Sequence, residues 1–120
     1  VQRLVGEIKE AAEVVFDLTL GGVFDRHPRL KIVLVEAEIG WMPWIIEKMD
    51  QKLEKTLKAK GSANPLALPP SEYCKRHVYA TFFNDPVGTR MLGWWGVDNC
   101  MWSSDFPHPN STWPNSSAKI

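Results

Sequence analysis

Three side chains that can bind a metal ion or transfer a proton each follow an apolar stretch of the sequence. Asp105 ends the run over residues 98–105, His108 follows between two prolines, and Glu36 stands near the end of the run over residues 31–37. Carboxylates and imidazole are ligands of divalent metals, and a metal-bound water becomes a nucleophile near neutral pH. Without a metal, a glutamate and a histidine can act as general base and general acid. Both kinds of chemistry remain open from these residues alone.

The segments that must position these side chains alternate between helix and strand patterns. Apolar residues recur at helical spacing in three stretches, which are residues 3–19, a stretch from Pro43 onward and a stretch from Pro86 to about Trp95. Apolar runs predict three strands, at residues 31–37, 78–83 and 98–105. This order predicts right-handed βαβ crossovers and a parallel sheet, and hence an α/β fold. Residues 1–120 are predicted to form a single partial domain with an irregular tail at 106–120.

The ends of the predicted strands divide the polar residues into two groups. In parallel α/β folds the loops that follow the strands carry the functional groups. Six candidate residues follow a predicted strand: Glu36, Glu38, Asn84, Asp85, Asp105 and His108. We therefore expect them to converge on one face of the domain. His27 and His77 precede their strands and are predicted to be ordinary loop or capping residues.

Several of these candidates also have a simpler structural interpretation. Asp85 is suited to cap a helix that begins at Pro86, Asn84 to complete a turn, and Glu38 to lie in solvent as a loop acid. Glu36 ends a buried strand, where a carboxylate needs a cation or hydrogen bonds. Asp105 is the strongest functional candidate, because it closes an aromatic-rich strand and precedes Phe106 and a proline.

Composition excludes some classes of function. The 120 residues include 14 basic and 14 acidic side chains, so the net charge is zero and no basic stripe favours nucleic acid. No apolar run approaches the roughly 20 residues that a membrane span needs. The charged, amphipathic residues 1–10 do not resemble a signal peptide. The cysteines, Cys74 and Cys100, have no metal-binding spacing, and they favour a reducing, cytoplasmic location.

Three longer stretches resemble the amidohydrolase-related superfamily over nearly the whole chain. They are "GGVFDRHPRLKIVLVEAEIGWMPWIIEKMD", "VYATFFNDPVG" and "GVDNCMWSSDFPHPNSTWPNS". The most similar branch contains aminocarboxymuconate-semialdehyde decarboxylase and related metal-dependent decarboxylases and hydrolases. The resemblance implies a (β/α)8 TIM barrel, of which the predicted strands would be the sixth, seventh and eighth.

The resemblance also implies a site and a chemistry. The family binds one divalent metal, usually zinc, at the C-terminal face of the barrel, and Asp105 matches the aspartate that ends the eighth strand and binds the metal. Glu36 stands where the family usually has a catalytic histidine, and we expect it to act as a metal ligand or base. Asn84, His108 and Trp113 are expected to contact a small carboxylated or cyclic organic substrate. The implied activity is that of a hydrolase or a non-oxidative decarboxylase.

Part of the family's metal site has no counterpart in this sequence. The family carries a His-x-His pair on its first strand and a further histidine on its fifth, and the 120 residues contain no His-x-His. The chain therefore resembles the C-terminal third to half of a barrel, and we expect it to be inactive by itself. Its exposed edges would be covered by a second copy or by the missing N-terminal part of the barrel.

Two other functions remain as alternatives. The chain could be a non-catalytic, truncated α/β module or pseudoenzyme that acts in assembly. It could also be an open doubly wound sheet that binds a nucleotide, although it contains neither a GxGxxG motif nor a Walker loop.

Overall fold

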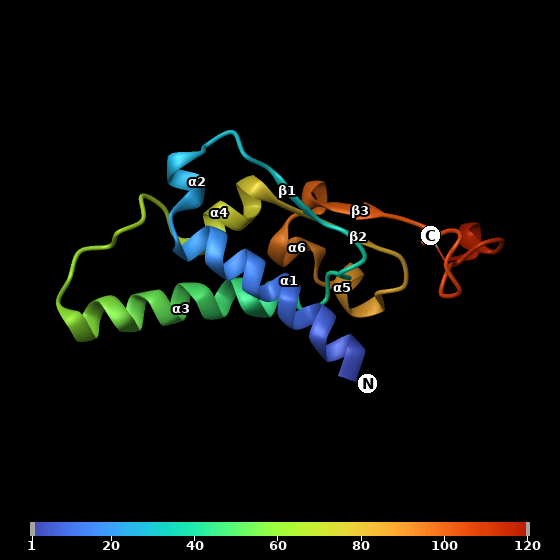
Figure 1. The fold of residues 1–120 in the computed structure, drawn as a ribbon, viewed down its shortest axis with the longest axis horizontal. Helices are drawn as coiled ribbons and strands as arrows, with labels where there is room; N and C mark the ends of the chain where they lie inside the picture. Colours follow the sequence, from blue (N-terminus) through green and yellow to red (C-terminus); the bar gives the residue numbers. More distant parts are fainter. Residues whose placement is uncertain (1, 120) are drawn as a thin grey trace.

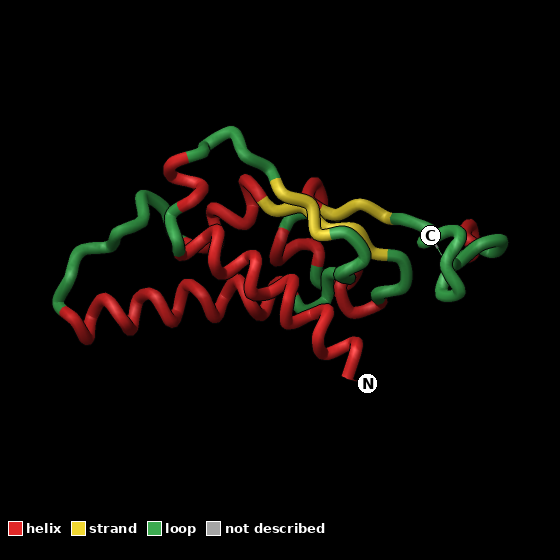
Figure 2. Tube along the Cα trace, in the orientation of Figure 1, coloured by secondary structure: helices red, strands yellow, loops and turns green. Residues whose placement is uncertain are grey.

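The sheet lies on one side of the molecule and the main helices lie on the other (Figure 1). The structure, a computed structural model, describes residues 2–119 and measures 55 × 31 × 22 Å along its principal axes. All three strands are parallel, in the order β1-β2-β3, so the middle strand of the sequence is also the middle strand of the sheet. Figure 2 shows the strands (yellow) running together on the upper side of the molecule, above the main helices. The parallel α/β architecture predicted from the sequence is confirmed.

The elements follow one another in the predicted helix–strand alternation. The strands are β1 (Ile32–Leu34), β2 (Val78–Phe82) and β3 (Cys100–Trp102). The α-helices are α1 (Gln2–Leu20), α2 (Val23–Arg26), α3 (Met42–Lys60), α4 (Pro70–His77), α5 (Pro86–Arg90) and α6 (Leu92–Trp95). Two short 3₁₀ helices complete the described part of the chain, η1 (Val97–Asn99) and η2 (Ser116–Ala118).

Some boundaries differ from the sequence prediction. The strands are shorter than the predicted runs over residues 31–37, 78–83 and 98–105, because turns and η1 occupy the ends of those runs. The helix expected between Pro86 and Trp95 is divided at Met91, whose φ of −106° and ψ of 8° leave the helical region. The predicted irregular tail contains one short helix, η2.

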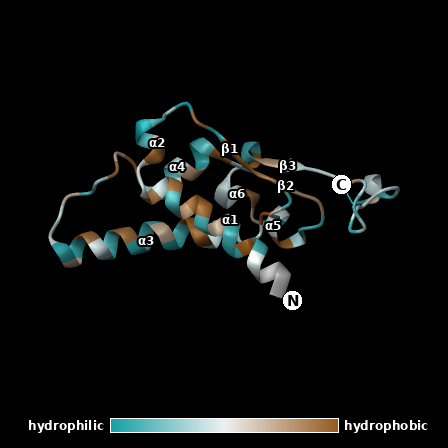
Figure 3. Ribbon diagram, viewed as in Figure 1, coloured by the Kyte–Doolittle hydropathy of each residue, from teal (hydrophilic) through white to brown (hydrophobic). Residues whose placement is uncertain are grey.

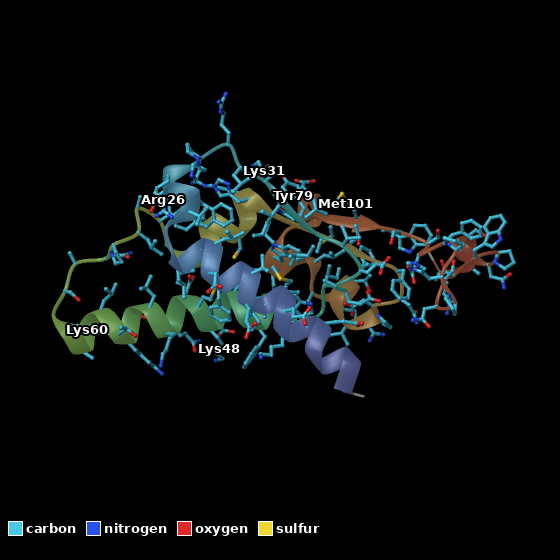
Figure 4. All side chains as sticks on the ribbon, viewed as in Figure 1. Arg26, Lys31, Lys48, Lys60, Tyr79 and Met101 are labelled. Carbon is cyan, nitrogen blue, oxygen red and sulfur yellow. The ribbon has the colours of Figure 1, made fainter. Side chains whose placement is uncertain are left out.

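The two faces of the sheet have different surroundings. Leu34 pairs with Ala80, which pairs with Cys100, and this row faces the helices. Leu34 and Ala80 are buried in a core that includes residues of α1, α3, α4 and α6. Val33 and Met101 lie on the opposite face and are exposed. Figure 3 shows hydrophobic residues along the strands, and Figure 4 labels Tyr79 and Met101 on the strands of this second face.

The amino-terminal end of the strands is closed by a buried histidine. His77, which ends α4, stacks on Phe24 with ring centroids 4.4 Å apart. Its Nδ1 atom lies 2.7 Å from the carbonyl oxygen of Leu30. His27 lies at the same end and is exposed. Both histidines are therefore remote from the strand ends at which the candidate site was predicted, and His77 has a clear packing role.

Among residues 2–119, none of the helices combines the length and the apolar character that crossing a bilayer would require.

Candidate metal centre

Glu36, Asp105 and His108 come together at the carboxyl end of the sheet. One oxygen or nitrogen ligand atom from each residue lies within 4.8 Å of the other two. Glu36 follows β1, and Asp105 and His108 follow β3. Since adjacent strands lie about 4.8 Å apart, the outer strands run about 10 Å apart on either side of β2. The two loops must therefore bend toward each other across the end of β2.

The imidazole of His108 lies between the two carboxylates. Its Nδ1 atom is 2.7 Å from Oδ1 of Asp105 and 3.4 Å from Oε1 of Glu36. The Asp105 side chain is only 6% exposed, whereas those of Glu36 and His108 are 48% and 60% exposed. The hydrogen bond and the negative charge of Asp105, followed by the charge of Glu36, raise the pKa of His108 above its ordinary value. In this cluster the carboxylate of Asp105 is shielded from solvent, whereas the side chains of Glu36 and His108 are accessible.

Both carboxylates stand on backbone that non-glycine residues rarely adopt. Glu36 has a φ of 58°, Asp105 one of 57°, and the nearby Glu38 one of 53°, all in the left-handed region. This conformation costs about 1–2 kcal/mol for an L-residue with a Cβ atom. Such strained residues concentrate at functional sites, where the surrounding structure holds them in place. Here the left-handed residues turn the chain sharply at the end of β1 and after β3.

The loop that carries Asp105 and His108 is tied to the sheet by main-chain contacts. The Ser103 amide donates to the carbonyl oxygen of Phe82 at 2.8 Å, which continues the pairing of β3 with β2. The carbonyl oxygen of Ser104 accepts the Thr112 amide at 3.0 Å. The His108 amide donates to the carbonyl oxygen of Asp105 at 2.9 Å and closes a tight turn. This turn brings the side chains of positions 105 and 108 to the same side of the loop.

Glu38, Asn84 and Asp85 lie near the cluster but outside it. Oε2 of Glu38 accepts the amide of Phe83 at 3.4 Å. Burial, supplemented by the charges of Asp85 and Asp105, raises the pKa of Glu38, while hydrogen bonds from the amides of Phe83 and Asn84 oppose the rise. Oδ1 of Asp85 accepts the Gly88 amide at 2.7 Å and caps α5, as the sequence indicated. The Asn84 side chain is exposed.

The Trp113 side chain lies in the loop beyond the cluster. It is 63% exposed and meets the ring of Phe106 edge to face, with centroids 5.9 Å apart. The segment that carries both rings projects past the strand ends (Figure 1, red). Phe106 was noted in the sequence only as the neighbour of Asp105 and was not predicted as a site residue. The substrate contacts assigned to Asn84, His108 and Trp113 stay predictions.

Thr81 is a second residue that the sequence analysis missed. Its hydroxyl oxygen accepts the main-chain amide of Glu36 at 2.9 Å. Thr81 lies on β2 in register with Met101 of β3, so it lies between the two loops that form the cluster. The threonine among the apolar and aromatic residues of the run "VYATFF" was the available signal.

The three side chains of the cluster fit a divalent cation. Two carboxylates and one imidazole are a common donor combination for zinc, manganese and related ions. Their ligand atoms converge, and both carboxylates stand on left-handed backbone. Three donors leave coordination positions for water or substrate. The two carboxylates make the set oxygen-rich, which suits a hard cation.

Comparisons with known proteins give one family and several similar structures. The profile of the amidohydrolase family matches residues 4–119. The 5-carboxyvanillate decarboxylase LigW from Sphingomonas paucimobilis is 31% identical, with a TM-score of 0.65 over 84% of this chain and 30% of that one. No curated protein matches the chain.

Two further structures share the fold at lower identity. The dihydroxybenzoic acid decarboxylase from Polaromonas sp. JS666, with bound manganese and the inhibitor 2-nitroresorcinol, is 21% identical with a TM-score of 0.68, covering 92% of this chain and 33% of that one. The 5-carboxyvanillate decarboxylase from Novosphingobium aromaticivorans DSM 12444, complexed with manganese and 4-hydroxy-3-methoxy-5-nitrobenzoic acid, is 20% identical with a TM-score of 0.67, covering 88% and 30%. The chain spans about a third of these structures. The predicted fold, three parallel strands of a (β/α)8 barrel with their flanking helices, is confirmed.

Proposed function

Since this chain belongs to the amidohydrolase family, we propose that its gene product is a metal-dependent, non-oxidative decarboxylase of small aromatic carboxylates. The observation that carries the proposal is the convergence of Glu36, Asp105 and His108 within 4.8 Å. The decarboxylase with 31% identity supports the choice of decarboxylation over hydrolysis. Hydrolysis of a cyclic substrate through an activated water is the second candidate, because the same donors serve both reactions.

We propose Asp105 and Glu36 as carboxylate ligands of a divalent cation. The nearly buried Asp105 is the fixed ligand, and the half-exposed Glu36 closes the site from the other loop. The family resemblance implied zinc, whereas the oxygen-rich donor set and the manganese in two similar structures favour manganese. A bound divalent cation would supply positive charge that orients the oxygen atoms of an anionic substrate.

The residues of this chain have separate roles in the proposed reaction. In decarboxylation the bond between the ring carbon and the carboxylate carbon breaks, its electron pair stays on the ring carbon, and that carbon takes up one proton. His108 is placed to hold this proton, because Oδ1 of Asp105 accepts a hydrogen bond from the Nδ1–H group of the imidazole and favours the protonated ring. Trp113 and Asn84 are proposed to contact the substrate from the rim.

The proposal is tested on the intact gene product. Metal content is measured by elemental analysis, and release of carbon dioxide from 5-carboxyvanillate and from dihydroxybenzoates is measured in the presence of manganese or zinc. We expect about one metal ion per chain and loss of both metal and turnover in Asp105→Ala. Asp98→Ala, which removes an exposed carboxylate from η1, is the matched control and retains both. An Asp105→Ala protein with normal turnover would overturn the proposal.

A further inference from the structure

The position of Glu36 in the cluster depends on residues that do not bind the metal themselves. Glu36 leaves the outer strand β1 and must reach Asp105 and His108 across the end of β2, on left-handed backbone. We propose that Thr81, within β2, and Asp85, in the loop after it, are positioning residues that hold the 36–40 turn so that the Glu36 carboxylate points into the metal site. This inference rests on the proposed metal site and adds residues that bind no metal.

Thr81 holds the first residue of the turn. Its hydroxyl accepts the Glu36 amide at 2.9 Å, at the residue whose φ is 58°. The pairing of Thr81 with Met101 puts the hydroxyl on the sheet face opposite to the helices. The side chain of Glu36 extends from this anchored backbone toward His108 in the loop after β3. The contact therefore fixes the position from which the carboxylate departs.

Asp85 holds the last residues of the turn. A helix cap needs only its contact with the Gly88 amide, yet Oδ2 also accepts the amides of Ile39 at 2.8 Å and Gly40 at 2.5 Å. One carboxylate therefore joins α5 to the loop after β1. Glu38 adds a reciprocal contact, because its carboxylate accepts the amide of Phe83 in the loop after β2.

The packing of these two loops leaves no space for adjustment. A Cβ atom added to Gly40 would lie 2.9 Å from Oδ1 of Asp85, and one added to Gly88 would lie 2.3 Å from Cγ1 of Ile39. The two loops therefore approach each other so closely that only glycine fits at positions 40 and 88. The turn is held at residue 36 by Thr81 and at residues 39 and 40 by Asp85, so the direction of the Glu36 side chain is set before any ligand binds. Such outer contacts typically change metal affinity by about 10–100-fold when removed.

The test compares two threonines of the intact gene product. Thr81→Val removes the hydroxyl and keeps the shape of the side chain, and Thr81→Ser restores the hydroxyl. Thr89→Val is the matched control, because the Thr89 hydroxyl donates to the Pro86 carbonyl oxygen within α5 and does not contact the turn. Affinity for Mn²⁺ is measured by titration calorimetry, and hydrogen exchange of the Glu36 amide is measured in the metal-free protein. Asp85→Asn is measured in the same way.

We expect Thr81→Val to weaken Mn²⁺ binding by about 10–100-fold and to speed exchange of the Glu36 amide. Thr81→Ser and Thr89→Val should resemble the unsubstituted protein. Asp85→Asn should weaken binding without loss of folded structure. Unchanged Mn²⁺ affinity in Thr81→Val would overturn the inference. If the unsubstituted protein binds no divalent metal, the proposed function fails, and amide exchange then decides the inference: faster exchange in Thr81→Val supports it and unchanged exchange overturns it.

Discussion

The Nδ1 atom of His108 lies 2.7 Å from Oδ1 of Asp105, three residues earlier in the same tight turn. This contact orients an imidazole that is otherwise 60% exposed. We predict that His108→Ala weakens Mn²⁺ binding by the intact gene product about 10–100-fold, because the proposed ligand Asp105 loses the imidazole that orients its carboxylate. Calorimetric titration measures the effect. His27→Ala, at the opposite end of the strands, is the control, and equal losses in both variants would contradict the assignment.

The left-handed backbone of Glu36 predicts an inverted order of stability for two substitutions. At a φ of 58°, glycine has no Cβ strain, so Glu36→Gly should be more stable than Glu36→Ala by about 1 kcal/mol. Urea denaturation followed by tryptophan fluorescence measures the difference. At Glu13, an exposed position within α1, the order should reverse and alanine should be better by about 1 kcal/mol. If alanine is more stable than glycine at position 36 as well as at position 13, residue 36 is unstrained.

The close approach of α5 to the β1 loop predicts a large difference between two glycines. A Cβ at Gly88 would lie 2.3 Å from Cγ1 of Ile39, whereas a Cβ at Gly93 meets nothing within 4 Å. We expect Gly88→Ala to destabilise the protein by about 1–3 kcal/mol through overpacking. Gly93→Ala, within the short helix α6, should be neutral or stabilising by up to about 1 kcal/mol. Thermal unfolding of the two variants is the measurement, and a neutral Gly88→Ala would contradict the described packing.

Burial of the two free thiols predicts slow and strongly pH-dependent alkylation. Burial raises the pKa of Cys74 to about 12 and that of Cys100 to about 11. Because the thiolate reacts, alkylation of Cys100 by iodoacetamide should rise about tenfold per pH unit between pH 8 and 10. Cys74, which is fully buried, should react only after unfolding. Peptide-resolved mass spectrometry measures both rates.

Unfolded protein in urea is the reference for this experiment. There both thiols should titrate near the ordinary value of about 8.5. A plateau of Cys100 reactivity near pH 9 in the folded protein would show that its thiol is not shielded.

The sequence was most informative about which end of the sheet each residue occupies, because this depends only on the direction of the strands. The apolar runs that include β1 and β2 predicted parallel strands, and parallel strands necessarily place their carboxyl ends at one edge. That rule brought Glu36 and Asp105 into one region despite their separation along the chain, and the structure brings their ligand atoms together. The sequence also predicted Asp85 as the cap of α5.

Features that depend on contacts between loops could not be predicted in this way. Propensity disfavours a positive φ for Glu36 and Asp105, and only the surrounding packing selects it. The hydrogen bond from the Glu36 amide to Thr81 joins the turn after β1 to strand β2, 45 residues later, and leaves no local pattern in the sequence. Met91 interrupts the helix after Pro86 although the helix propensity of methionine is favourable, so local propensity does not predict this break.

The parallel register of β1, β2 and β3 also restricts how this architecture can grow. A chain that continues from one strand to a parallel neighbour must first travel back along the whole length of the sheet, which a tight hairpin cannot do. Each added strand therefore requires its own return segment, as α3 and α4 provide between β1 and β2. Insertions or duplications that preserve such a sheet must come as whole strand-and-helix units, whereas additions of a few residues are confined to the connecting loops.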